Sequence, residues 1–108
     1  MKSILIIGLG RFGRHLCRKF MSLNNEVMIV DRDEAAVTAL ADEVTSAQIA
    51  DCTDENALRA LGVKNFDLCF VCIGSDFASS LLITSMLKDM GAARVVAKAA
   101  RDHLDIYK

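Results

Sequence analysis

The sequence predicts an α/β fold, in which a doubly wound parallel sheet carries helices on both faces. Short apolar segments alternate with amphipathic ones along the 108 residues, and brief polar stretches without proline separate them. The first apolar segment, 3–7, leads through a glycine-rich turn into an amphipathic segment. Apolar residues make up 53% of the chain, which suits a sheet buried on both sides.

The alternation defines five strands and four helices in one small domain. Strands are expected at 3–7, 27–31, 47–50, 68–73 and 95–98, and helices at 11–23, 34–44, 54–61 and 77–90. We expect the Rossmann-like strand order 3-2-1-4-5, with right-handed crossovers and a ligand outside the carboxyl ends of the strands. The sequence of residues 101–108 predicts the beginning of a helix. We therefore expect these 108 residues to stop before a sixth strand and a C-terminal lobe.

The glycine-rich turn has the pattern G-x-G-x-x-G. Gly8 allows the tight turn after the first strand, Gly10 lets a phosphate approach the backbone, and Gly13 lets the helix pack on the strand. The first N–H groups of that helix and its dipole can then bind an anion. The same pattern also occurs in proteins that bind no nucleotide, where the small residues only let a helix pack on a strand. The prediction of a nucleotide site therefore depends on the strand before the loop, the helix after it and the acidic residue that ends the second strand.

Asp31 ends the second predicted strand, 18 positions after Gly13, where a carboxylate can accept hydrogen bonds from ribose hydroxyls. Its charge disfavours NADP, because two like charges about 4 Å apart repel by roughly 4 kcal/mol at an effective dielectric of about 20. The neighbouring Arg32 would offset part of this repulsion.

Polar residues also follow the third and fourth strands, and two interpretations of them stay open. Asp33, Thr53 and either Ser75 or Asp76 are good helix N-caps, so capping explains them as well as ligand contact does. Gly74 either serves only a tight turn or forms the second wall of a cleft opposite the glycine loop.

Composition excludes several other functions. With 13 basic and 14 acidic residues the net charge is −1, so the chain has no electrostatic footprint for nucleic acid or an acidic membrane surface. No apolar run reaches the roughly 18 residues that span a bilayer, and no signal peptide precedes the first strand. We therefore expect a soluble, cytoplasmic chain.

The four cysteines do not predict chemistry. Cys69 and Cys72 have C-x-x-C spacing, but inside a strand residues three apart point to opposite faces, so we expect buried thiols, as for Cys17 and Cys52, and no zinc or redox site. The two histidines, at positions 15 and 103, are isolated from possible ligands. No catalytic arrangement can be assembled, and we expect no metal and no enzyme activity.

Five short motifs, taken together, are similar to one known family. They are G-L-G-R-F-G at 8–13, V-D-R-D-E at 30–34, A-D-C-T-D-E at 50–55, V-C-I-G at 71–74 and A-K-A at 97–99. The chain resembles, over essentially its whole length, the N-terminal lobe of the regulator-of-potassium-conductance (RCK) or TrkA-N domain of Trk- and Ktr-type potassium uptake regulators. The second lobe that the family carries is not contained in these residues.

The resemblance implies a cytoplasmic regulatory subunit, peripheral to the membrane, that binds ATP, ADP or NAD(H) and gates a potassium-transporting membrane protein. It also implies a homodimer, or a larger ring. The helix at 77–90 has an apolar arc wide enough for such a contact, although core packing alone would also explain it.

The resemblance also implies roles for individual residues. The glycine loop would cradle phosphates, Asp31 would hold the ribose, residues 51–53 and Arg32 would line the adenine pocket, and residues 73–74 would close the opposite wall. Lys98 matches the fifth-strand lysine of the family. The implied contacts are Gly8, Leu9, Gly10, Arg11, Phe12, Gly13, Asp31, Arg32, Asp51, Cys52, Thr53, Ile73, Gly74 and Lys98.

Three alternatives stay open. Arg11 can bind a terminal phosphate through two parallel hydrogen bonds, or it can be a solvated arginine at the start of a helix. The chain can also be the NAD-binding half of a dehydrogenase whose catalytic part lies elsewhere. A third possibility is a Rossmann-like domain that serves only as an assembly surface.

Overall fold

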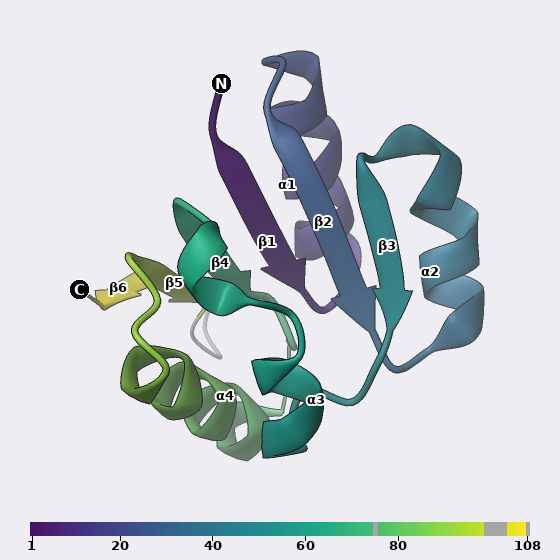
Figure 1. The fold of residues 1–108 in the computed structure, drawn as a ribbon. Helices are drawn as coiled ribbons and strands as arrows, with labels where there is room; N and C mark the ends of the chain where they lie inside the picture. The colour runs from purple at the N-terminus through teal and green to yellow at the C-terminus, as the bar shows by residue number, and fades with distance from the viewer. Residues whose placement is uncertain (75, 99–103, 108) are drawn as a thin grey trace.

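The computed structural model describes residues 1–74, 76–98 and 104–107 of the chain (Figure 1). In these residues a six-stranded sheet has the order β3-β2-β1-β4-β5-β6. The strands are β1 Ser3–Ile7, β2 Glu26–Asp31, β3 Ser46–Ile49, β4 Leu68–Val71, β5 Val95–Lys98 and β6 Leu104–Tyr107. The helices are α1 Arg11–Ser22, α2 Glu34–Leu40, α3 Glu55–Arg59 and α4 Phe77–Asp89, with short 3₁₀ turns η1 Ala41–Glu43 and η2 Val63–Asn65.

The first five strands are parallel, which confirms the order 3-2-1-4-5. Helices α1 and α2 cover one face of the sheet and α3 and α4 cover the other (Figure 1). Along β1, Ile4 and Ile6 pack against the first pair of helices, whereas Leu5 and Ile7 pack on the side of the second pair. This two-sided burial explains why β1 is an unbroken apolar run.

The prediction for the last segment of the chain is wrong. Leu104–Tyr107 form β6, which pairs antiparallel with β5, where we expected the beginning of a helix and no sixth strand. An unpaired edge of β5 would expose a row of backbone N–H and C=O groups, and the strand satisfies these groups. The apolar–polar alternation of the segment from Leu104 to Tyr107 is the sequence signal for this strand.

Two helices are shorter than the sequence predicts. Helix α2 ends at Leu40 and continues only as η1, because Asp42 and Glu43 place negative charge at the negative end of the helix dipole. Glu43 instead accepts a hydrogen bond from Nε of Arg18 on α1 at 3.1 Å. Helix α3 has five residues and is followed by Gly62, which adopts a left-handed φ of 69°.

The capping predictions hold for two helices and fail for the third. Asp33 accepts from the N–H of Ala35 at the start of α2, and Asp76 accepts from the N–H of Ser79 at the start of α4. The alternative cap of α4, Ser75, lies outside the described residues. The N-cap of α3 is Asp54, not Thr53, because the Thr53 side chain is bonded to Asp51.

Candidate functional site

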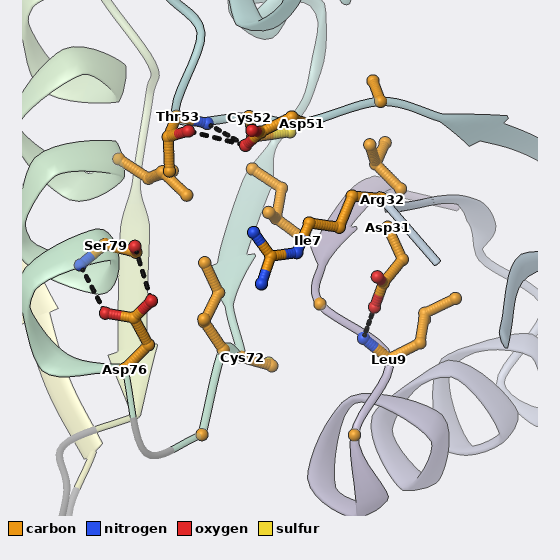
Figure 2. Close-up of a pocket in the computed structure, with 17 residues that line it drawn as sticks. Ile7, Leu9, Asp31, Arg32, Asp51, Cys52, Thr53, Cys72, Asp76 and Ser79 are labelled. Atoms are coloured by element: carbon orange, nitrogen blue, oxygen red, sulfur yellow. Dashed lines mark hydrogen bonds between the residues drawn. The ribbon is translucent and has the colours of Figure 1, made fainter. Parts of the chain in front are cut away.

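A cavity of about 340 Å³ opens at the carboxyl ends of β1 to β4, between α1 and α4 (Figure 2). Its volume is in the range of small-molecule sites, and its place is the switch point between β1 and β4. The predicted contact residues that line it are Gly8, Leu9, Gly10, Asp31, Arg32, Asp51, Cys52, Thr53, Ile73 and Gly74. We call this cavity the cleft.

Three of the expected contacts do not line the cleft, and a fourth has a side chain that the structure does not describe. Arg11, Phe12 and Gly13 belong to the first turn of α1 and are not among the lining residues. The backbone of Lys98 ends β5, but its side chain lies outside the described part of the chain. In the described part of this segment, the loop residues Gly8, Leu9 and Gly10 line the cleft and the first turn of α1 does not.

Two residues of α4 that line the cleft, Ser79 and Ile83, were not predicted from the sequence. They line it together with Asp76, for which capping and ligand contact were both open interpretations. The spacing of positions 76, 79 and 83 places them on one face of a helix, and this periodicity was the available signal. The wall opposite the glycine loop therefore consists of Gly74 and the first turns of α4.

The glycines of the loop have different roles. A Cβ on Gly8, whose φ is 97°, would lie 2.5 Å from the carbonyl oxygen of Cys72, and a Cβ on Gly13 would overlap the carbonyl oxygen of Gly8. These two glycines are required for packing. At Gly10 a Cβ would meet nothing within 4 Å, although Gly10 lines the cleft. Packing among the described residues therefore does not require glycine at position 10.

Helix α1 begins at the cleft without a side-chain cap. Its N-cap is Gly10, and no side-chain hydrogen bond caps the helix. The positive end of the helix dipole at this place is a favourable position for an anion.

Asp31 joins the end of β2 to the glycine loop. Its Oδ2 accepts a hydrogen bond from the N–H of Leu9 at 2.7 Å (Figure 2). Its Oδ1 accepts one from the N–H of Asp33 at 2.9 Å. An ionised carboxylate offers about four lone-pair positions, so two remain for hydroxyl donors of a ligand. The same group can fix the loop and hold a ribose.

Two more carboxylates stand on the walls of the cleft, each held by its own loop. Oδ1 of Asp51 accepts from the Thr53 hydroxyl at 2.6 Å and from the Thr53 N–H at 3.0 Å. The oxygens of Asp76 accept from the N–H and the hydroxyl of Ser79 at 3.0 and 2.7 Å. These bonds hold the pKa of both carboxyl groups below its usual range, so both are ionised at neutral pH.

The cysteines are buried and unbridged, as the sequence predicts. Cys69 packs on the α3 and α4 side of the sheet and Cys72 on the α1 and α2 side, so their thiols do not converge. Burial raises the pKa of Cys17 to about 11 and of Cys52 and Cys69 to about 12. Negative charge on Asp51 and Asp31 adds to the increase for Cys52, which lines the cleft.

These raised pKa values predict that the chain loses stability in base. Above about pH 9 the thiols of the unfolded chain release protons that the folded chain retains, so the free energy of unfolding falls as pH rises. The expected slope is up to about 1.4 kcal/mol per pH unit for each thiol. Urea unfolding between about pH 7 and about pH 11 measures it, and Cys52→Ala should show a shallower slope. An identical slope in that variant would contradict the assignment to Cys52.

Neither a metal-binding cluster nor a membrane-spanning helix is present among the described residues. Within them no group of three or more histidine, cysteine, aspartate or glutamate side chains is placed to hold a metal ion. None of the helices in the described ranges has both the length and the apolar character needed to cross a membrane.

The chain belongs to the TrkA-N domain family, which it matches over residues 4–107. Its curated relatives include the Ktr system potassium uptake proteins C and A of Bacillus subtilis. Both are 40% identical to it, over 94% and 91% of this chain. The chain spans less than half of these relatives, 46% of protein C and 44% of protein A.

A solved structure with the same fold is the NAD(P)-binding domain of an exopolyphosphatase-related protein from Archaeoglobus fulgidus. The TM-score is 0.79 at 26% sequence identity, and the match covers 92% of this chain and 74% of that one. The resemblance to the TrkA-N family and the Rossmann-like fold are thus confirmed.

Proposed function

We propose that this chain is the nucleotide-sensing domain of a regulator of potassium transport, and that it binds an adenine nucleotide or NAD(H) in the cleft. The family and the potassium uptake relatives support the transport role. The observation that carries the binding proposal is the hydrogen bond from the Leu9 N–H to Asp31. It holds a carboxylate that can accept bonds from ribose hydroxyls beside the glycine loop, whose backbone is accessible at Gly10. The related NAD(P)-binding domain supports the same ligand class.

The proposed ligand lies across the ends of β1 to β4. Its phosphates face the backbone of the glycine loop and the beginning of α1, and its ribose hydroxyls bond to Asp31. The adenine lies near residues 51–53, and residues 73–74 with the start of α4 form the opposite wall. The charge of Asp31 selects against the 2′-phosphate of NADP.

Isothermal titration of this chain with ATP, ADP, AMP, NAD⁺ and NADH tests the proposal. We expect at least one ligand to bind at micromolar strength, with NADP weaker than NAD⁺. Retention of NADH absorbance after prolonged incubation with candidate hydride acceptors would argue against the dehydrogenase alternative. No binding by any of the five would instead favour a domain that serves only in assembly.

Arg11 stands outside the cleft, at the first exposed position of α1, so we propose that it reaches only a phosphate that extends beyond the glycine loop. Arg11→Ala should therefore lower the affinity for ATP about tenfold, which corresponds to about 1.4 kcal/mol, and leave the affinity for AMP nearly unchanged. Titration with both ligands measures this difference. Equal weakening of ATP and AMP would show that the side chain does not read the terminal phosphate.

We also propose that the chain dimerises through α4, within a cytoplasmic assembly attached to a potassium-transporting membrane protein. The core accounts for Ile83 and Leu87, which are buried, but Phe77, Leu81 and Leu82 remain 59%, 54% and 46% exposed on the same helix. Such an apolar patch on a surface is typical of a contact between proteins.

Leu81→Asp should abolish this dimer, because it places a charge in the centre of the patch. Sedimentation velocity over a concentration series measures the change, and Ser85→Asp on the rim of the same helix is the milder control. A wild-type chain that is monomeric at all concentrations would contradict the proposed contact.

A further inference from the structure

Arg32 directly follows β2 and extends into the cleft. Among the described residues that line the cleft, it is the one with a cationic side chain. Its guanidinium lies in the space between the Asp31 end of the cleft and the wall formed by Asp76 and Ser79 (Figure 2). The position of Arg32 therefore lies on the path that a bound nucleotide would take between the two walls.

Among the residues that the structure describes, no partner holds the guanidinium of Arg32 in place. Within residues 1–74, 76–98 and 104–107, the ion pairs are Arg18 with Glu43 and Arg59 with Glu55, and no hydrogen bond of Arg32 is present. Arg32 is also exposed, so no packing holds the side chain in one position. It can change partners at low cost.

The charges around Arg32 pose a problem for an anionic ligand. Three carboxylates line the cleft, those of Asp31, Asp51 and Asp76, against the single guanidinium. Each of the three is bonded to backbone or hydroxyl donors of its own loop and not to Arg32. Without Arg32, a nucleotide phosphate would enter a cleft whose side-chain charges are all negative.

The positive charge of Arg32 nevertheless acts on carboxylates on both sides of the cleft, those of Asp51 and Asp76. Its charge contributes to the lowered pKa of Asp51 and of Asp76, after the larger contributions of the Thr53 and Ser79 hydrogen bonds. The two carboxylates come from loops that follow β3 and β4, on opposite sides of the cleft. Arg32 thus stands between them as a shared counter-ion.

We propose that Arg32 exchanges partners when a nucleotide binds: it leaves the field shared by Asp51 and Asp76 and pairs with a phosphate of the ligand. This inference rests on the proposed function, and it makes Arg32 the residue that selects charged adenosine compounds over uncharged ones. Asp31 recognises the ribose that all of them share, whereas Arg32 offsets the repulsion that only the phosphorylated ones meet.

Titration with ADP and with adenosine tests the selection. Arg32→Gln should weaken ADP about tenfold, as expected for loss of one charge-assisted hydrogen bond, and change adenosine less than about twofold. The matched control is Arg94→Gln, because Arg94 is exposed and precedes β5 at the opposite end of the sheet. It removes the same charge and should change neither affinity.

Asp76→Asn tests the exchange itself. Asparagine is as good an N-cap as aspartate, so α4 keeps its start. Removing this carboxylate should increase the affinity for ADP. The increase should be about two- to fivefold larger with Arg32 present than in the Arg32→Gln background, which is the range for an exposed charge pair. A carboxylate that only repels the ligand would give equal gains in both backgrounds.

The outcomes separate this inference from the proposed function. Wild-type ADP affinity in Arg32→Gln, or equal gains from Asp76→Asn in both backgrounds, overturns the exchange and leaves nucleotide binding in place. A wild-type chain that binds none of ATP, ADP, AMP, NAD⁺ and NADH overturns both. Unchanged thermal unfolding of the variants, measured by circular dichroism, establishes that the exposed substitutions leave the fold intact.

Discussion

Gly13→Ala is expected to destabilise the chain by about 3 kcal/mol or more, at the upper end of overpacking in a dense interior. The new Cβ would overlap the carbonyl oxygen of Gly8 and lie 3.4 Å from the Cβ of Cys72. The oxygen belongs to the backbone and cannot move away without shifting the glycine loop from β4. Urea unfolding followed by circular dichroism measures the loss, and nucleotide binding should be lost with the loop geometry.

Gly10→Ala is the matched control in the same loop. The φ of Gly10 is −67°, which alanine adopts without strain, and the new Cβ would meet nothing within 4 Å. We expect its stability to stay within about 1 kcal/mol of the wild type, while ADP affinity falls because the methyl group stands where a phosphate approaches. A Gly13→Ala variant as stable as Gly10→Ala would contradict the close packing of α1 on β1.

Asp31→Ala should give the second largest effect, on binding more than on folding. The substitution removes the acceptor of the Leu9 and Asp33 N–H groups and, in the proposed mode, that of the ribose hydroxyls. Charge-assisted hydrogen bonds contribute about 1.5–3 kcal/mol each, so loss of two to the ligand corresponds to at least about a hundredfold weaker adenosine, AMP and ADP binding. Titration of all three ligands measures it.

The control is Asp33→Asn, two residues away. Asparagine retains the cap of α2 and removes one charge near the cleft, so the affinity for the three ligands should change little. If Asp31→Ala bound adenosine as the wild type does, the carboxylate would be a brace for the glycine loop and not a ribose ligand.

The sequence predicted the sheet and the location of the cleft well, because both depend on strong local signals. The apolar run of β1, buried on both faces, and the glycine loop after it are recognisable without tertiary information. The carboxyl ends of parallel strands meet at one edge, so Asp31, Asp51 and Gly74 could be placed around one cleft from their positions after strands.

The rest depended on contacts that the sequence does not specify. Thr53 is a good cap by residue type, but its hydroxyl is bonded to Asp51, and Asp54 takes the cap instead. The strand β6 pairs with the open edge of β5, and the short apolar–polar alternation of Leu104–Tyr107 does not by itself specify that partner. Likewise Arg11 lies next to the loop glycines in sequence, yet its place in the first turn of α1 leaves it outside the described lining of the cleft, whereas Arg32, which the resemblance implied as a contact, lines it.

Nucleotide binding in the cleft is tested most directly by a titration of the ¹⁵N-labelled chain with ADP, followed by amide chemical shifts. The proposed mode predicts the largest shifts at Leu9, Gly10, Arg32 and Thr53, saturating at one equivalent in the way that a single site requires. Amides at the opposite end of the sheet, such as that of Arg94, should remain unchanged. Saturating shifts at another surface, or none at Leu9 and Gly10, would contradict it.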